Sequence, residues 1–236
     1  MAILLAHTFT AFIVLAAPWL GRVWYKKVRL RIASGELGVR IRLYRSLVVE
    51  QVLVAGVVLL LWRGGISASS LGLVTPRSWT VFLLVLLVIV GTLLWSALRL
   101  RPKAQKLRVR LKEGVGMFLP TTQEERSWWG AVSIGAGISE ELAFRGFLLY
   151  YLAAFLPQLN TPERILVSSL LFGFAHLYQG WKGMIGTGIL GAFFAGLYLL
   201  SGSLLLPAIF HAAVDYRVLL IFPPETSTSR AAEGPA

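Results

Sequence analysis

The stretch WTVFLLVLLVIVGTLLWSAL, residues 79–98, contains no charged side chain and decides the fold class. A helix of about 20 residues rises about 30 Å, which is the thickness of the hydrocarbon core of a bilayer. Because a chain inside lipid must satisfy its own backbone hydrogen bonds, this run predicts a membrane-spanning α-helix. The whole chain agrees, since 56% of its 236 residues are hydrophobic and its mean hydropathy is +0.71.

Further apolar spans flank this run on both sides. Together they predict an all-α fold, a polytopic transmembrane bundle of about seven to eight helices with a polar site within the membrane. One of them, 127–156, is too long for a simple crossing and is expected to be either a long tilted helix or a helix broken near Arg145. The expected spans are 3–20, 46–62, 127–156, 165–179, 183–203 and 204–222.

The chain is expected to have three parts. Residues 1–126 hold N-terminal transmembrane helices with basic cytoplasmic loops, 127–222 form a helical core, and 223–236 form a polar, disordered tail. The first 20 residues lack the positive region of a cleaved signal peptide, so we expect a retained helix with its N-terminus away from the cytoplasm. Segment 100–114 is expected to be a solvated loop or an amphipathic interfacial helix.

The net charge of +12 is concentrated in two clusters between apolar runs. Segments 22–45 and 99–126 each carry eight Lys or Arg residues, whereas 63–78 carries only two. This placement is typical of cytoplasmic loops that face anionic lipid headgroups, with 63–78 on the other side. Membrane lipids are therefore the expected partners of these charges, and nucleic-acid binding is not expected.

Ionisable side chains within membrane spans are rare and are usually paired or functional. In the second half of this chain they concentrate in three short stretches. The residues are Glu140, Glu141 and Arg145 in ISEELAFRG, His176 in LLFGFAH, and His211 and Asp215 in PAIFHAAVD.

The two adjacent glutamates are expected to differ in role. On a helix, Glu141 and Arg145 stand four residues apart on one face and can neutralise each other. Glu140 is turned about 100° away and gains no partner from its own helix. A spare carboxylate in a low dielectric suits proton transfer, so Glu140 is the candidate general base.

Several chemistries remain open for this set of residues. A carboxylate can activate water with help from imidazole, or Glu140, His176 and His211 can bind zinc, although the H-E-x-x-H signature is absent. Serine hydrolysis is the weakest of the three, because neither Ser139 nor Ser169 stands in a G-x-S-x-G context. The chain has no cysteine, which excludes disulfides, thiol catalysis and cysteine metal sites.

Other polar or small residues in the spans have simpler explanations. His7 has no acidic neighbour and is expected to make an interhelical hydrogen bond. Glu50 lies at the start of its span and is expected to reach the interface. Gly188, Ala192 and Gly196 recur on one helix face and predict close helix packing.

The polar residues also form motifs in a characteristic order. The chain resembles the CPBP intramembrane proteases, which include CAAX prenyl endopeptidases and bacteriocin-processing (Abi) homologues. The resemblance covers roughly residues 127 to 220. It rests on E-E-x-x-x-R at Glu140, Glu141 and Arg145, on F-x-x-x-H at Phe172 and His176, and on H-x-x-x-N at His211, with Asp215 in the last place.

This resemblance implies a metal-free, glutamate-type intramembrane endopeptidase with a helical fold. It implies that Glu140 and His176 activate water, and that His211 and residue 215 stabilise the oxyanion. Glu141, Arg145 and Phe172 would support the site. The implied protein is an integral, multi-pass protein of a bacterial cell membrane, and its substrate is a peptide or protein that is membrane-associated or prenylated.

Asp215 departs from the family pattern, which has asparagine at this place. An ionised aspartate would repel an oxyanion, so Asp215 either donates in its protonated form or instead orients and charges His211. Two rival functions accompany the protease hypothesis. They are a non-catalytic scaffold or immunity protein of the same fold and a zinc-dependent membrane hydrolase. A transporter is less expected, because no duplicated discontinuous helices are seen.

Overall fold

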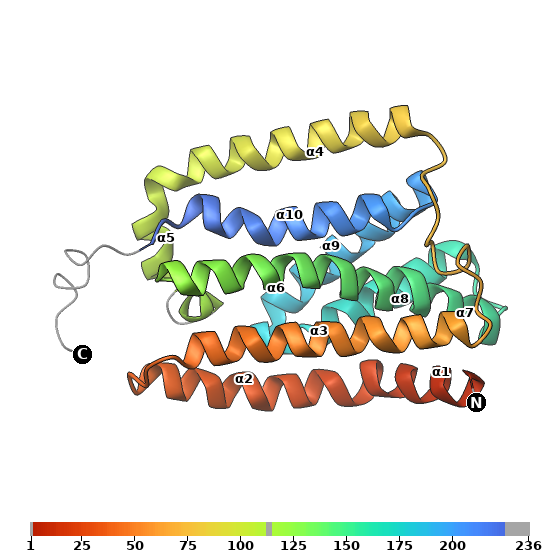
Figure 1. The fold of residues 1–236 in the computed structure, drawn as a ribbon, viewed down its shortest axis with the longest axis horizontal. Coiled ribbons are helices and arrows are strands. Elements are labelled where there is room, and N and C mark those ends of the chain that lie inside the picture. Colours follow the sequence, from red (N-terminus) through yellow and green to blue (C-terminus); the bar gives the residue numbers. More distant parts are fainter. Residues whose placement is uncertain (1, 112–114, 225–236) are drawn as a thin grey trace.

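The computed structural model describes residues 2–111 and 115–224, and the regular structure in these ranges is entirely helical. The helices pack into a bundle, so the predicted all-α class is confirmed (Figure 1). Most of the predicted disordered tail, residues 225–236, lies outside the described residues. Nothing in the structure tests the predicted division at residue 127.

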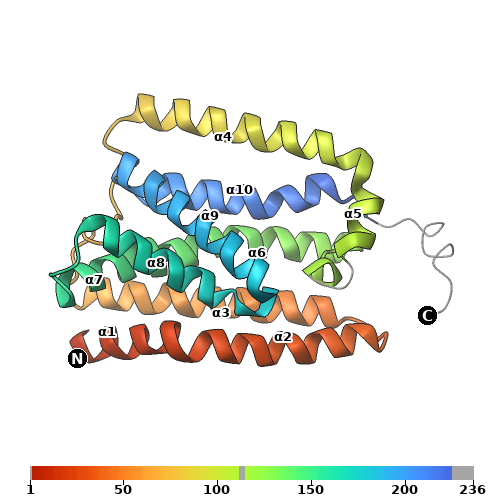
Figure 2. The same ribbon diagram turned by 180° about the vertical axis from the view of Figure 1, so that it is seen from behind.

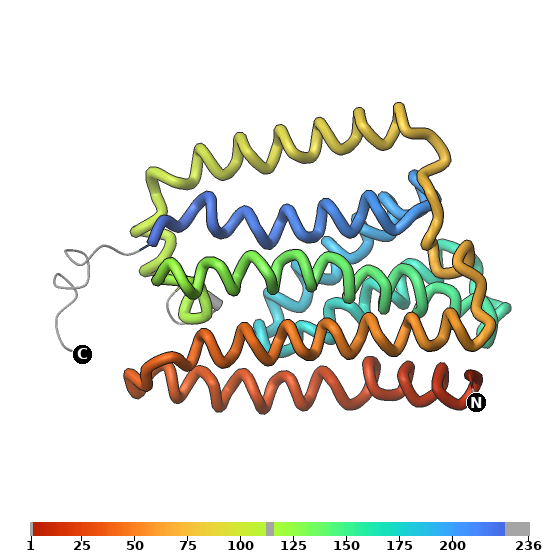
Figure 3. The backbone as a smooth tube through the Cα atoms, in the orientation of Figure 1, coloured from red at the N-terminus to blue at the C-terminus, as the bar shows by residue number. Residues whose placement is uncertain are grey.

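The N-terminal half begins with a long helical hairpin. Helix α1 (Ala2–Ala11), a π-helical segment (Phe12–Ala16) and α2 (Ala17–Ala33) form one continuous helix, visible as an unbroken tube in Figure 3. A short turn then leads to α3 (Val39–Arg63).

Glu36 stabilises the turn of this hairpin. Its carboxylate pairs with Arg31 at 2.6 Å and with Arg42 at 2.5 Å. The hydrogen bond from Arg31 is the main reason why the pKa of Glu36 lies below its usual value. The turn therefore holds basic residues of both helices together at one end of the bundle.

The apolar run at 79–98 forms α4 (Trp79–Leu100), whose N-terminus is capped by the Ser78 hydroxyl. A 3₁₀ turn (Arg101–Lys103) and α5 (Ala104–Leu111) follow directly, and a second 3₁₀ turn covers Val115–Phe118. The helical prediction for segment 100–114 is thus the correct one through residue 111, and 112–114 lie outside the described residues.

The long span near 127–156 is a single helical rod with an altered middle. Helix α6 (Gln123–Glu141) starts at a capping box in which the Thr122 hydroxyl and the Glu125 carboxylate satisfy each other's backbone N–H groups. It continues without a break into a π-helical segment (Leu142–Leu148) and α7 (Leu149–Phe155). The helix is therefore continuous near Arg145 and not broken. Its turns are wider there, because a π-helix has hydrogen bonds between residues five apart where an α-helix has them four apart.

The last three helices place the histidines. Helix α8 (Thr161–Ala175) ends at His176 and a 3₁₀ turn (Leu177–Gln179) leads into α9 (Gly180–Ser201). Helix α10 (Leu205–Ile221) then returns along α6. The predicted span 165–179 is wrong in its limits, because the chain turns at His176.

Among the described residues, four helices are long and apolar enough to cross a membrane: Ala2–Ala33, Val39–Arg63, Trp79–Leu111 and Leu177–Ser201. The predicted spans at 127–156, 165–179 and 204–222 do not belong to this set. Helix α8 has 15 residues and α10 has 17, fewer than the roughly 20 needed for a full crossing. The α6 rod carries charged residues near its start and at its centre.

The layout of the bundle puts α6 and α10 in the middle. Helices α3 and α10 flank α6, α4 lies against the outer side of α10, and the α1–α2 rod runs along α3 (Figure 1). Seen from behind, α8 and α9 cross the bundle obliquely (Figure 2). The α2–α3 turn and α5 lie at one end, and the N-terminus and the 64–78 loop lie at the other, so the two basic segments share an end.

Glycine allows α8 and α9 to approach closely. A Cβ at Gly173 would stand 2.5 Å from the Met184 carbonyl oxygen and 3.1 Å from the Gly188 Cα. The predicted small-residue packing face is correct at Gly188 only. Ala192 is exposed and a Cβ at Gly196 would meet nothing within 4 Å.

Candidate active site

Three helices bring the predicted catalytic residues together. Glu140 comes from α6, His176 from the end of α8 and His211 from α10. The Glu140 Oε2 atom lies 3.8 Å from His176 Nε2 and 3.9 Å from His211 Nε2. Asp215 Oδ2 lies 3.7 Å from the same His211 nitrogen. All four predicted catalytic side chains therefore lie around one point, although they come from distant parts of the sequence.

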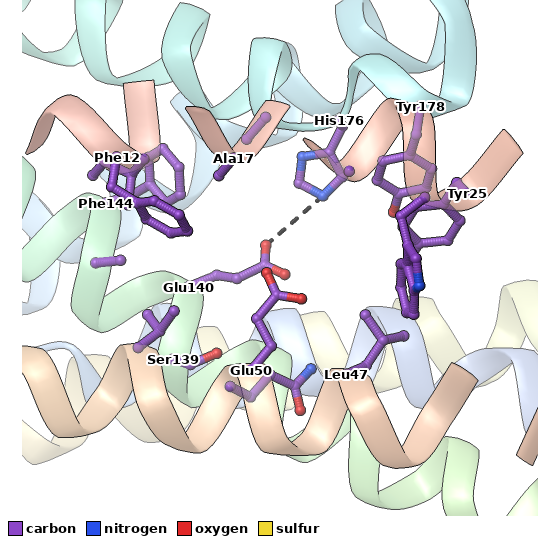
Figure 4. A pocket seen from close by; sticks show the side chains of 17 residues that line it. Phe12, Ala17, Tyr25, Leu47, Glu50, Ser139, Glu140, Phe144, His176 and Tyr178 are labelled. Carbon is purple, nitrogen blue, oxygen red and sulfur yellow. Dashed lines mark ion pairs between the residues drawn. The ribbon is translucent and has the colours of Figure 1, made fainter. Parts of the chain in front are cut away.

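His176 of the motif F-x-x-x-H lies at the C-terminal end of α8. His176 Nδ1 lies 2.8 Å from the Phe172 carbonyl oxygen, which can only accept, so Nδ1 carries the proton. The bond satisfies a carbonyl in the last turn of α8. In the neutral ring, Nε2 is then an acceptor, and it faces Glu140 (Figure 4).

Glu141 has two partners, and one of them was not expected. Its Oε1 atom accepts from Arg145 Nη1 at 3.1 Å, as the four-residue spacing predicted, and from His211 Nδ1 at 2.8 Å. The Glu141 and Arg145 side chains are both fully buried. The hydrogen bond at His211 Nδ1 is thus made by Glu141, and Asp215 lies on the opposite side of the ring, near Nε2.

Arg145 is held by aromatic rings as well as by Glu141. Its guanidinium carbon lies 4.3 Å from the ring centre of Phe172 and 5.3 Å from that of Phe194. Its Nη2 donates to the Gly191 carbonyl oxygen at 2.8 Å. Arg145 lies in the π-helical segment Leu142–Leu148. Cation–π contacts in a desolvated site contribute about 2 kcal/mol.

Sequence reasoning missed Phe194 and Gly191, which belong to this support. The Phe194 ring stacks on His211, with centroids 4.7 Å apart and an interplanar angle of 18°. A Cβ at Gly191 would lie 2.9 Å from Phe172 Cδ1 and 3.0 Å from Arg145 Nη2. Both residues lie in the glycine-rich segment GAFFAG, whose composition alone indicated packing but not contact with the site.

Two cavities meet at Glu140 and His176. The inner cavity, of about 160 Å³, lies between the α1–α2 rod, α3 and α6, and its walls include Phe12, Val54 and Phe144. The second cavity reaches His211 and Asp215. Glu140 and His176 line both cavities, so both cavities lead to the candidate site.

Glu50 lines the inner cavity and faces Glu140 in Figure 4. The sequence predicted that Glu50 reaches the membrane interface. In the structure Glu50 is exposed and also lines the inner cavity, which the sequence did not predict. His7, by contrast, makes the expected interhelical contact, with Nδ1 2.7 Å from the Tyr151 hydroxyl.

The serine and zinc hypotheses concern residues in the same region. Ser139 and Ser169 are buried, and neither hydroxyl makes a hydrogen bond to a histidine among the described residues. Within residues 2–111 and 115–224, no three His, Asp or Glu side chains are grouped as metal ligands. Zinc binding by Glu140, His176 and His211 is a question for chelation experiments.

Comparison with known proteins gives a match at the level of a family. No curated protein and no solved structure matches the chain. Residues 122–217 match the family described as type II CAAX prenyl endopeptidase Rce1-like. The matched segment begins at the capping residue of α6 and includes every motif residue of the site. Over less than half of its length, the chain is thus similar to this family of CAAX-type proteases, which agrees with the resemblance predicted from the motifs.

Proposed function

We propose that this protein is a multi-pass intramembrane endopeptidase that hydrolyses a peptide bond with water activated by Glu140 and His176. The observation that carries this proposal is the spacing at Glu140. Its Oε2 atom is buried without a hydrogen-bond partner among the described residues, and two imidazole Nε2 atoms face it at 3.8 and 3.9 Å. These separations exceed a hydrogen bond and suit a small molecule held between the groups.

The donor and acceptor pattern favours water as that molecule. Ionised Glu140 only accepts, and neutral His176 accepts at Nε2 because its Nδ1 proton is directed to Phe172. A water molecule has two protons to donate, one to each group. Its oxygen lone pairs are then free to attack a substrate carbonyl.

Side chains of this protein can carry out the proton transfers that hydrolysis requires. Glu140 takes a proton from water while the oxygen bonds to the scissile carbonyl carbon and forms a tetrahedral oxyanion. Collapse of this species breaks the C–N bond, and the proton taken from water passes to the leaving amine. The products are an amine and a carboxylic acid, which ionises by releasing the second proton of the water to solvent, and Glu140 returns to its starting state.

His211 is suited to stabilise the oxyanion. Glu141 holds its Nδ1 proton, and in the imidazolium form Nε2 also donates. Such a donor is worth on the order of 3 kcal/mol of transition-state stabilisation. A protonated Asp215, at 3.7 Å from the same nitrogen, adds a second donor where the family pattern has asparagine.

The substrate class follows from the setting of the site. Apart from the polar groups around Glu140, the inner cavity is lined largely by apolar residues, and two of the helices beside it, Ala2–Ala33 and Val39–Arg63, are long and apolar enough to span a membrane. A membrane-associated or lipidated peptide can reach such a site without leaving the bilayer. The Rce1-like match supports a prenylated peptide as the first probe.

The test uses the full chain in liposomes with an internally quenched peptide that carries a prenylated cysteine. Cleavage detected by fluorescence and located by mass spectrometry is expected, and 1,10-phenanthroline is expected to leave the rate unchanged. Loss of activity with the chelator, restored by added zinc, would replace the metal-free reaction with zinc-dependent hydrolysis. Absence of cleavage in this assay, and of any peptide difference between membranes containing wild-type and Glu140→Gln protein, would favour a scaffold.

A further inference from the structure

A third pocket, called here the outer pocket, lies beside the inner cavity and the second cavity. The end of the α1–α2 rod supplies Arg22, Lys26 and Arg29, and the α8–α9 turn supplies Gln179 and Trp181. The pocket measures about 700 Å³, within the range of sites that bind small ligands or peptide ends. The three cations stand at positions i, i+4 and i+7 of one helix face, and none of the described residues that line the pocket is acidic.

These three cations have no counter-charge in the part of the chain that the structure describes. Arg22, Lys26 and Arg29 make no hydrogen bond or ion pair within residues 2–111 and 115–224. The Arg29 Nε atom is buried and has no hydrogen-bond partner there. A buried donor without a partner is unfavourable, so an anionic ligand that accepts a hydrogen bond from Arg29 Nε would stabilise this place.

A pair of tyrosines connects the outer pocket to the site. Tyr25 and Tyr178 stack face to face, with centroids 3.9 Å apart and an interplanar angle of 7° (Figure 4). Both residues line the outer pocket, the inner cavity and the second cavity. A chain bound in the outer pocket would therefore pass this pair on its way to Glu140 and His176.

We propose that the outer pocket binds a carboxylate of the peptide substrate, with Arg22, Lys26 and Arg29 as its ligands. This inference rests on the proposed endopeptidase function and adds a specificity site to it. Residues 22–29 lie outside the matched segment 122–217, so the family likeness does not cover them. A peptide fits better than a lipid headgroup because the pocket shares its tyrosine wall with both catalytic cavities.

The experiment measures binding separately from cleavage. Inactive Glu140→Gln protein in neutral-lipid liposomes is titrated with three fluorescent prenylated peptides, which end in a free carboxylate, in an amide, or in an amide with an acidic side chain nearby. The carboxylate peptide is expected to bind about tenfold or more tightly than the plain amide, because a charge-assisted hydrogen bond contributes about 1.5–3 kcal/mol. The third peptide distinguishes a terminal carboxylate from a side-chain one.

Single substitutions then locate the effect. We expect weaker binding of the carboxylate peptide, and unchanged binding of the plain amide, in each of the variants Arg22→Gln, Lys26→Gln and Arg29→Gln. Lys27→Gln is the matched control, because Lys27 is an exposed neighbour on the same helix that does not line the pocket. In active protein the three variants should raise KM for the carboxylate peptide and change kcat little.

Three results would overturn the proposal. The first is equal affinity for the carboxylate and amide peptides, and the second is a loss of affinity in Lys27→Gln as large as in the three pocket variants. The third is a loss of affinity for either peptide that depends on the content of anionic lipid in the liposomes. The last result would assign the pocket to lipid headgroups. If wild-type protein binds the carboxylate peptide selectively but cleaves nothing, the endopeptidase proposal fails and the binding site stands.

Discussion

His211 Nδ1 lies 2.8 Å from Glu141 Oε1, and this hydrogen bond distinguishes Glu141 from the adjacent Glu140. Glu141 is fully buried and is shared between His211 and Arg145, whereas Glu140 keeps an oxygen without a hydrogen-bond partner among the described residues, beside the imidazoles of His176 and His211. One helical step of about 100° separates the two carboxylates. Glu141 thus positions a histidine, and Glu140 is left free to react.

Removal of Arg145 should destabilise the protein. Arg145→Met strands the Glu141 carboxylate in a fully buried place, and breaking one partner of a buried ion pair costs about 3–5 kcal/mol. The melting temperature in detergent should fall markedly. The double variant Glu141→Leu/Arg145→Met removes both charges and should recover much of the stability.

The double variant should nevertheless stay inactive, because His211 has lost its Nδ1 partner. Stability and cleavage rate are measured on the same preparations. A single Arg145→Met variant as stable as the wild type would contradict the buried pair. An active double variant would show that Glu141 does not position His211.

Two glycines of α9 form a matched pair. Gly191→Ala places a Cβ against Phe172 and Arg145, and such overpacking typically costs about 1–3 kcal/mol. Gly196→Ala meets open space and should be neutral or stabilising by roughly 0.5–1 kcal/mol, since alanine favours the helix. Thermal unfolding of both variants checks this prediction, and equal melting temperatures would mean that Gly191 does not contact the site.

The sequence predicted the helical class and the chemical identity of the site, because both depend on local patterns. An uninterrupted apolar run implies a membrane helix whatever its neighbours are. The four-residue spacing of Glu141 and Arg145 likewise implies their ion pair. Motif order then indicated that Glu140, His176 and His211 act together.

The contacts between distant segments could not be predicted in the same way. The bond from His211 to Glu141 and the stacking of Phe194 depend on how α9 and α10 cross α6. The position of Glu50 beside Glu140 was not predicted, because it is a property of the bundle and not of either helix. The chain turn at His176 was missed, since neither glycine nor proline occurs in the three residues that follow it.

The substitution Asp215→Asn restores the residue of the family pattern. Because Asp215 faces His211 Nε2 and not Nδ1, we expect residue 215 to act as an oxyanion donor. Asparagine should then preserve or raise activity, with the gain greatest at higher pH, where an ionised aspartate repels the oxyanion most. The pH–rate profiles of both forms on one peptide provide the measurement, and a large loss for the asparagine form at every pH would contradict the donor role.

The most direct test of the central claim compares two glutamates of α6 in one cleavage assay. Glu140→Gln removes the proposed base, while Glu124→Gln makes the same chemical change at an exposed position of the same helix. Both variants should fold and melt like the wild type. Loss of a general base typically lowers the rate about 10²–10⁴-fold, so Glu140→Gln should lose roughly 99% or more of the activity and Glu124→Gln should retain it. A Glu140→Gln protein that keeps more than about a tenth of the wild-type rate would contradict the proposed mechanism.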